Sequence, residues 1–199
     1  MVSFSRAELE AFRDQEVPDL IRTDPAQAPL KLLFVGINPG LWTAAVQTHF
    51  SHPGNRFYPA LHRAGITGYE LSRTDGMRPE DRAHMIERGI GITNLVRRAT
   101  VRASELTRDE LREGGERLLR FVAEQRPRVV AIAGITAYRD AFGERTAVLG
   151  RQPDRIGSPF GDAALWVVPN PSGLNAHETV DTLAAAYRAA AVEAGVVAD

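Results

Sequence analysis

The sequence predicts an α/β fold: a single-domain, three-layer α/β/α arrangement with a short, mainly parallel central sheet. Short apolar runs alternate along the chain with segments of helical periodicity, as in successive β-α-β units. We find no internal repeat and no interdomain linker. A chain of 199 residues, of which 44% are hydrophobic and 25% charged, can bury one sizeable core. We expect residues 1–28 to form an N-terminal arm and residues 29–199 to form the domain.

The expected strands are short runs that are apolar almost throughout, as in strands buried on both faces of a sheet. They comprise residues 31–36, 90–95, 128–134 and 164–168. The first and last are followed closely by Asn38-Pro39 and Asn170-Pro171, and Asn-Pro is a strong turn signal. Parallel sheets bind ligands beyond the carboxyl ends of their strands. Both Asn-Pro pairs are therefore expected at the same edge of the sheet.

The expected helices occupy the segments before and between the strands. They comprise a polar helix within the arm, residues 53–64 with Pro53 in the first turn, residues 82–88, residues 106–125, a short helix through Ala141 and Phe142, and residues 175–194. Asn175 is expected to cap the last helix, with Glu178 three residues later completing a capping box.

Composition and missing motifs exclude several classes of protein. The 24 Lys+Arg against 25 Asp+Glu give a net charge of −1, which disfavours a non-specific nucleic-acid coat but permits a local basic patch. The absence of cysteine removes thiol nucleophiles, disulfides and Cys-ligated metals. The sequence has no phosphate-binding P-loop, no complete dinucleotide loop, no serine-hydrolase elbow and no zincin motif. We expect no metal, no cofactor and no membrane association, and a cytoplasmic location.

Three segments carry the remaining signal. They are Gly-Ile-Asn-Pro-Gly at residues 36–40, His-Phe-Ser-His-Pro-Gly-Asn-Arg-Phe-Tyr at residues 49–58, and Pro-Asn-Pro-Ser-Gly-Leu-Asn at residues 169–175. Together they resemble the mismatch-specific uracil/thymine-DNA glycosylase family of the uracil-DNA glycosylase superfamily. The resemblance covers roughly residues 30–190 and includes residues 91–96 and a Glu113-Gly114-Gly115 turn. Each motif is weak on its own, and their occurrence in the family's order makes the signal strong.

The resemblance implies a monofunctional DNA glycosylase of base excision repair. Such an enzyme flips uracil out of a G·U mismatch in duplex DNA and excises it, leaving an abasic site without metal or cofactor. A lyase step is not expected, because it needs an activated amine and Lys31 is the only lysine in the chain. The expected partner is double-stranded DNA containing a mismatched uracil, bound by a monomer in a bacterial-type, nucleoid-associated setting.

Asn38 is the expected catalytic residue. The resemblance implies that its amide holds a water against the sugar C1′. An amide is not a general base, so the reaction must depend on a stabilised uracil anion and an oxocarbenium-like sugar. The alternative is a turn residue whose amide bonds its own backbone.

The expected base-binding residues are Ile37, Thr43, Phe50 and Asn170. The resemblance implies that Phe50 stacks on the extruded base, although an aromatic near a helix start can also be core. Thr43 corresponds to the wall that faces the pyrimidine C5. Because threonine is bulkier than alanine or serine, we predict poor removal of thymine and good removal of uracil.

Leu174 is the expected DNA wedge, and Gly173 is the expected contact to the opposite strand. Leu174 would fill the space that the flipped nucleotide leaves, and Gly173 would offer its backbone to the widowed guanine. The alternative is a hydrophobic staple onto the closing helix. Ala176 stands where some relatives place a long basic side chain, so one contact to the opposite strand is expected to be missing.

Arg97 and Arg98 are the expected DNA phosphate contacts, and residues 49–63 contain a second cluster of histidines and arginines. A solvated surface is the ordinary meaning of such clusters. Three other functions stay open: a glycosylase of broader uracil or damaged-base specificity, a non-catalytic DNA-binding domain of the same fold, and an unrelated hydrolase acting through Asp154 or Asp162. The last would need a carboxylate pair across a cleft, and no spacing supports one.

Overall fold

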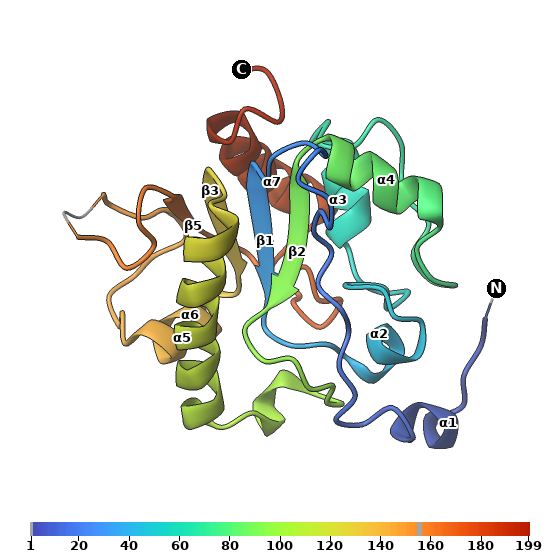
Figure 1. The fold of residues 1–199 in the computed structure, drawn as a ribbon. Helices are drawn as coiled ribbons and strands as arrows, with labels where there is room; N and C mark the ends of the chain where they lie inside the picture. The colour runs from blue at the N-terminus through green and yellow to red at the C-terminus, as the bar shows by residue number, and fades with distance from the viewer. Residues whose placement is uncertain (1, 155–156) are drawn as a thin grey trace.

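The computed structural model describes residues 2–154 and 157–199 and confirms the three-layer α/β/α class (Figure 1). Its sheet has five strands in the order β2-β1-β3-β5-β4. These are β1 (Leu32–Gly36), β2 (Ile90–Asn94), β3 (Val129–Ala133), β4 (Gly150–Arg151) and β5 (Ala164–Val168). The four longer strands are parallel and match the expected runs, whereas the two-residue β4 pairs antiparallel with β5 and was not expected.

Helices cover both faces of the sheet, because alternate strand residues point to opposite sides. Even-numbered Leu32 and Phe34 of β1 face α3 (Phe57–Arg63), α4 (Pro79–Glu87) and α7 (Val180–Glu193). The odd-numbered residues of β1 face α5 (Arg108–Gln125) and α6 (Ile135–Phe142). Both faces of the sheet are therefore buried, which explains the almost uninterrupted apolar runs.

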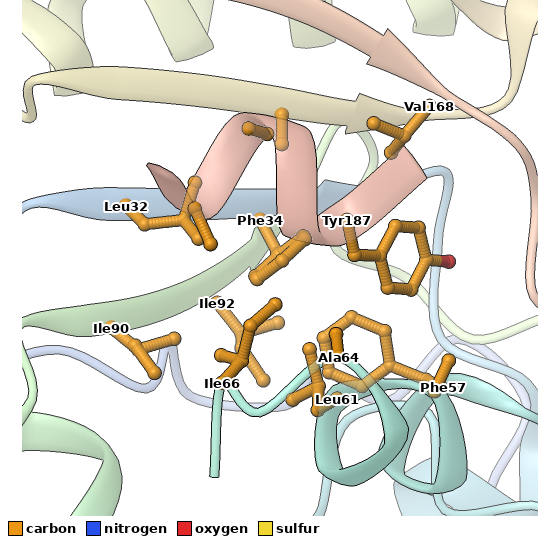
Figure 2. Packing of buried hydrophobic residues seen from close by; sticks show 14 of the residues in the cluster. Leu32, Phe34, Phe57, Leu61, Ala64, Ile66, Ile90, Ile92, Val168 and Tyr187 are labelled. Atoms are coloured by element: carbon orange, nitrogen blue, oxygen red, sulfur yellow. The ribbon is translucent and has the colours of Figure 1, made fainter. Parts of the chain in front are cut away.

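An aromatic cluster forms the centre of the first core (Figure 2). The Phe34 ring of β1 meets Phe57 of α3 edge-to-face at 5.1 Å and lies 5.4 Å from the ring of Tyr187 in α7. All three side chains are almost fully excluded from solvent. The first turn of α3 is thereby held against the sheet, close to where β1 ends.

Three local predictions are wrong. The helix expected from Pro53 begins at Phe57, and the preceding residues form a turn. The last helix begins at Val180, capped by Thr179 with Thr182, so Asn175 is not its cap. Glu113-Gly114-Gly115 lies within α5, and a side chain on Gly114 would overlap the carbonyl oxygen of Leu95. These glycines serve close helix packing and do not form a turn.

Two short helices lie near the carboxyl end of β2 (Figure 1). Helix α1 (Arg6–Glu10) belongs to the arm, and α2 (Leu41–Ala45), which was not expected, follows the first Asn-Pro pair. The rest of the arm runs along the outer edge of β2, where Leu20 and Ile92 exchange backbone hydrogen bonds of 2.9 and 2.8 Å. Val17 and Leu20 are buried, so this part of the arm packs on the domain. Among the described helices, none has the length and apolar character needed to cross a membrane.

Candidate active site at the carboxyl edge of the sheet

The loops that follow β1 and β5 meet at one edge, as predicted. Ile37 and Asn170 approach each other across Gly134, which follows the intervening strand β3. A Cβ on Gly134 would lie 3.3 Å from Ile37 Cδ1 and 3.9 Å from Asn170 Cβ, and its φ of 123° favours glycine. A cavity of about 210 Å³ opens here, lined by residues that include Ile37, Asn170 and Asn175.

The side chain of Asn38 is fixed through its nitrogen. Nδ2 lies 3.1 Å from the carbonyl oxygens of Pro39 and Arg98 and 2.7 Å from Thr100 Oγ1. Within the described part of the chain, Oδ1 receives no hydrogen bond. The Asn38 amide is therefore more than a turn residue that bonds its own loop, because two of its three partners belong to residues 98–100. Its oxygen is available to accept a hydrogen bond from a water.

Thr100 is a site residue that the sequence analysis missed. It is buried, and its hydroxyl donates to the carbonyl oxygen of Arg102 at 2.9 Å, which leaves an oxygen lone pair for Asn38 Nδ2. Its backbone N–H donates to Pro39 at 3.1 Å. The loop after β2 thus holds the loop after β1. No local motif marks a threonine this far beyond a strand.

Phe50 is braced by the core. Its half-buried ring stacks on Phe57 with centroids 4.1 Å apart, and its edge lies against Gly36 at the end of β1. Phe50 has a φ of 55°, a left-handed conformation that costs a bulky residue of order 1 kcal/mol or more. The position of Phe50 is therefore compatible with both alternatives: its ring packs on the core and also lies at the edge of the candidate site.

Thr43 lies in α2 and is buried, with only 5% of its surface exposed. Its Oγ1 accepts a hydrogen bond of 3.4 Å from the hydroxyl of Ser51, the residue after Phe50. The Thr43 methyl and hydroxyl are thus confined beside the loop that carries Phe50. Its predicted role as a wall against the pyrimidine C5 stays a prediction.

Leu174 is 88% exposed, the most exposed large apolar residue among those described. Exposure on this scale excludes the hydrophobic staple, in which Leu174 would pack on the closing helix. Gly173 lies so close to the loop that follows Phe50 that a Cβ on Gly173 would come within 2.6 Å of the carbonyl oxygen of Gly54. The role of Leu174 as the wedge and that of Gly173 as the opposite-strand contact stay predictions.

Arg56 connects the loop that bears Phe50 to the loop that bears Leu174. Its guanidinium donates to the carbonyl oxygens of Ser172 and Asn175 at 2.7 Å each and to that of Glu178. Its own backbone N–H donates to Pro171 at 3.0 Å. Arg56 belongs to the cluster of histidines and arginines at residues 49–63, yet these four hydrogen bonds make it a clamp on the Leu174 loop.

Asn94, the last residue of β2, is a second site residue that the sequence analysis did not single out. Its side chain is buried, with Nδ2 3.0 Å from Nδ1 of His49. A Cβ on Gly36 would overlap Asn94 Oδ1 and would lie 3.1 Å from the Phe50 ring. The feature of the sequence that could have identified Asn94 is its position at the carboxyl end of an expected strand. His49 itself is buried, so it does not belong to a basic surface cluster.

Arg97 and Arg98 are each paired with carboxylates. Arg97 lies 3.1 Å from Glu16, and Arg98 lies 2.5 Å from Glu110 and 3.0 Å from Asp14. Arg98 and the capping hydrogen bonds of Thr107 lower the pKa of Glu110 to about 2. Contact of either arginine with DNA phosphates stays a prediction, and it would require these pairs to rearrange or share their donors.

A cavity larger than the one at the candidate site lies elsewhere. It measures about 960 Å³, is bounded by parts of α5 and α6 and by residues 151–154 and 158–165, and contains none of the predicted site residues. Asp154 and Asp162 both contribute to its lining, and Asp154 is ion-paired with Arg151 at 3.0 Å. The described residues contain no group of three or more His, Cys, Asp or Glu that could hold a metal ion.

The fold and site together define an open α/β domain with its candidate site beyond the carboxyl ends of parallel strands. A family model of the uracil DNA glycosylase superfamily matches residues 25–193. The chain belongs to this superfamily. Its members are DNA glycosylases that hydrolyse the N-glycosidic bond of uracil in base excision repair, and this is the class of activity that membership indicates for the chain.

Proposed function

We propose that this protein is a monofunctional, mismatch-specific uracil-DNA glycosylase that acts as a monomer on G·U mismatches in duplex DNA. The observation that carries the proposal is the pairing of two features at one edge of the sheet. Asn38 presents an anchored amide with an available oxygen, and the neighbouring loop exposes Leu174 on a clamped backbone.

The chemistry follows from what an amide can do. Asn38 Oδ1 accepts a hydrogen bond from a water and so orients the water oxygen toward C1′. The C1′–N1 bond breaks with its electron pair going to uracil N1, and the water oxygen then bonds C1′ and loses a proton to solvent. Because Asn38 cannot take that proton, the barrier is lowered by stabilising the uracil anion and the oxocarbenium-like sugar. Slow turnover and a preference for easily expelled bases follow.

Base extrusion is assigned to the Leu174 loop and to the walls of the pocket. Unstacking costs about a few kcal/mol and least at a mismatch, which favours G·U over a Watson–Crick pair. An apolar wedge on a fixed loop fills the vacated stack. The walls around the flipped base are then formed by Phe50, Ile37 and Asn170.

A lyase step is not part of the proposal. Lys31 directly precedes β1, and its Nζ lies 3.4 Å from the carbonyl oxygen of Gly195. It is therefore at the amino end of the strand whose carboxyl end carries Asn38. The enzyme should release the base by water attack and leave the sugar attached to the phosphate groups on both of its sides.

The test compares matched duplexes with one uracil opposite guanine or adenine and a uracil-containing single strand, followed by alkaline cleavage of abasic sites. Strand breaks concentrated in the G·U duplex, and reduced there by Leu174→Ala, support the proposal. Equal cleavage of all three substrates would favour the broader-specificity alternative. Tight mismatch binding without cleavage would favour the non-catalytic DNA-binding domain.

A further inference from the structure

One peptide group in the loop after β2 joins the N-terminal arm to the side chain of Asn38. It is the group between Arg98 and Ala99. Its carbonyl oxygen, that of Arg98, accepts the hydrogen bond of 3.1 Å from Asn38 Nδ2. Its N–H, that of Ala99, donates to the carbonyl oxygen of Gln15 in the arm at 2.9 Å. A single planar unit therefore has the arm on one side and Asn38 on the other.

The next peptide group, between Ala99 and Thr100, repeats this arrangement. Its carbonyl oxygen accepts a hydrogen bond of 2.9 Å from the N–H of Asp14 in the arm. Its N–H donates to the carbonyl oxygen of Pro39 at 3.1 Å. Residues 98–100 thus lie like a strand between the arm and the loop after β1. Because each peptide unit is planar, a shift of the group on the arm side also shifts it on the other side.

An apolar cluster joins the same segments. Its members come from the arm, from α2 and from the loop after β2: Val17, Leu41, Ala44 and Ala99, with the partly buried Leu9 and Phe12 packed against them. Helix α1 of the arm lies beside α2 (Figure 1). Gln47, which follows α2, donates through Nε2 to the carbonyl oxygen of Glu16 at 3.2 Å. The arm therefore supports α2, the element that begins directly after the first Asn-Pro pair.

We propose that the arm residues Asp14 and Gln15 are positioning residues for Asn38 and act through these two peptide groups. The nitrogen of the Asn38 amide needs fixed acceptors if its oxygen is to face the water. Arg98 and Thr100 supply two of those acceptors, and both belong to the segment that the arm holds. The inference rests on the proposed glycosylase function, because the orientation of the amide affects the rate through the water.

The backbone of Asp14 offers a way to test this hold. Asp14 has a φ of 62°, a left-handed conformation that directs its N–H to Ala99. Aspartate and asparagine tolerate this conformation, whereas a β-branched residue strongly opposes it. The Asp14 side chain is exposed and pairs with Arg98 at 3.0 Å. Substitution of Asp14 therefore changes the backbone or the charge without removing a buried group.

Asp14→Val and Asp14→Asn separate the backbone from the charge. Both remove the carboxylate that pairs with Arg98, so any change in a phosphate contact of that arginine is common to the two variants. We expect Asp14→Val to excise uracil from the G·U duplex in a single turnover about fivefold or more slowly than Asp14→Asn, with Kd for the duplex within about twofold. Equal rates in the two variants, or a difference confined to Kd, would overturn the inference.

A double-mutant cycle with Asn38→Ala tests whether the arm acts through Asn38. In the Asn38→Ala background, Asp14→Val and Asp14→Asn should differ in excision rate by less than about twofold, because the amide that the arm positions is gone. Persistence of the full difference in that background would show that the arm acts on another step, and would overturn the inference.

Hydrogen exchange of the Thr100 amide tests the hold of the arm without any activity measurement. This amide donates to Pro39, outside the arm, and should exchange about fivefold or more faster in Asp14→Val than in Asp14→Asn. Phe12→Ala, which removes an aromatic ring of the arm from the apolar cluster, should also speed this exchange relative to the wild type. Thermal unfolding of each variant reports whether it folds.

Unchanged exchange of the Thr100 amide in both Asp14→Val and Phe12→Ala would overturn the inference. Faster exchange in Asp14→Val without a slower excision rate would overturn it as well. Absence of uracil excision by the wild type, with the exchange accelerated as expected in the variants, would overturn the proposed function but not the hold of the arm on this loop.

Discussion

Asn38, the residue proposed to orient the attacking water, is held by a hydroxyl from another loop. Thr100 Oγ1 is the closest partner of Asn38 Nδ2, at 2.7 Å, and the Thr100 hydroxyl hydrogen is already donated to Arg102. Removing this acceptor would leave Nδ2 only the carbonyl oxygens of Pro39 and Arg98, both at 3.1 Å, and so would weaken the hold on the amide's orientation. The sequence could indicate Asn38 from its turn and its place after a strand, but not Thr100, which depends on the tertiary approach of two loops.

We therefore predict that Thr100→Val lowers kcat on the G·U duplex by about tenfold, with KM changed by less than about twofold, because orientation is lost without loss of a DNA contact. Thr100→Ser keeps the hydroxyl and should stay close to the wild type. Steady-state kinetics on the same duplex measure both variants. A loss confined to KM would assign Thr100 to DNA binding.

Thr43 is the residue at which substrate choice between uracil and thymine is predicted. The side chain is buried beside Ser51 and has little room to move away from a C5 methyl group. Thr43→Ala should raise the single-turnover rate on G·T by about tenfold while it leaves G·U within about threefold. Equal wild-type rates on G·T and G·U would show that Thr43 does not exclude the methyl group.

At the scale of elements, the loop that exposes Leu174 is held by its own turn hydrogen bonds and by the guanidinium of Arg56. Arg56 donates to three carbonyl oxygens of residues 172–178, two of them at 2.7 Å. Each bond contributes about 1 kcal/mol to holding the loop. If Leu174 acts as the proposed wedge, its loop is already ordered before it meets the base stack.

Arg56→Gln should lower the G·U excision rate by about tenfold or more and speed hydrogen exchange of the amides in residues 172–178. The matched control is Arg63→Gln, because Arg63 makes an exposed ion pair with Asp181 outside this loop. The control should change neither quantity. Unchanged exchange in Arg56→Gln would mean that the loop is held by its own turns.

The start of α5 carries a pH-dependent contribution to stability. Glu110 accepts hydrogen bonds from Arg98 and from Thr107, and its pKa is lowered to about 2 from an ordinary value of 4.5. A lowered pKa in the folded state means that the stabilisation is complete above the unfolded value and is lost as the pH falls toward the folded value. The relevant window is therefore pH 4.5 down to about 2.

Glu110→Gln should reduce the free energy of unfolding by about 1 kcal/mol at pH 7, because the partly exposed pair is screened by solvent. The difference from the wild type should shrink progressively below pH 4.5. Urea unfolding at a series of pH values measures it. A difference that is independent of pH would show that shape, rather than charge, accounts for the contribution of Glu110.

Elements with strong local patterns could be predicted from sequence, and those set by tertiary contacts could not. β1, β2 and β3 are buried throughout, and β5 is buried in its last two residues, so their apolar runs are visible in the sequence. The start of α3 was misplaced because Pro53 is a good first-turn residue, whereas Phe57 is where core packing begins. The glycines of α5 read as a turn because the close approach to Leu95 cannot be seen in the sequence.

At the scale of the whole molecule, the candidate site arises from the sheet order. β1 and β5 flank β3, so the loops carrying Asn38 and Asn170 meet across the end of β3. The sequence predicts that parallel strands share an edge, but not which strands are neighbours. It also predicts an arm at the N-terminus without showing that Leu20 pairs with β2 and that Pro18 reaches His49.

Single-turnover excision of uracil from a G·U duplex by the wild type and by Asn38→Ala, with binding to the same duplex measured in parallel, tests the central claim most directly. We predict that Asn38→Ala lowers the rate by at least about a hundredfold, because the water is no longer oriented, and binds the duplex with nearly unchanged affinity. Retention of a wild-type excision rate by Asn38→Ala would contradict the assignment of the reaction to this site.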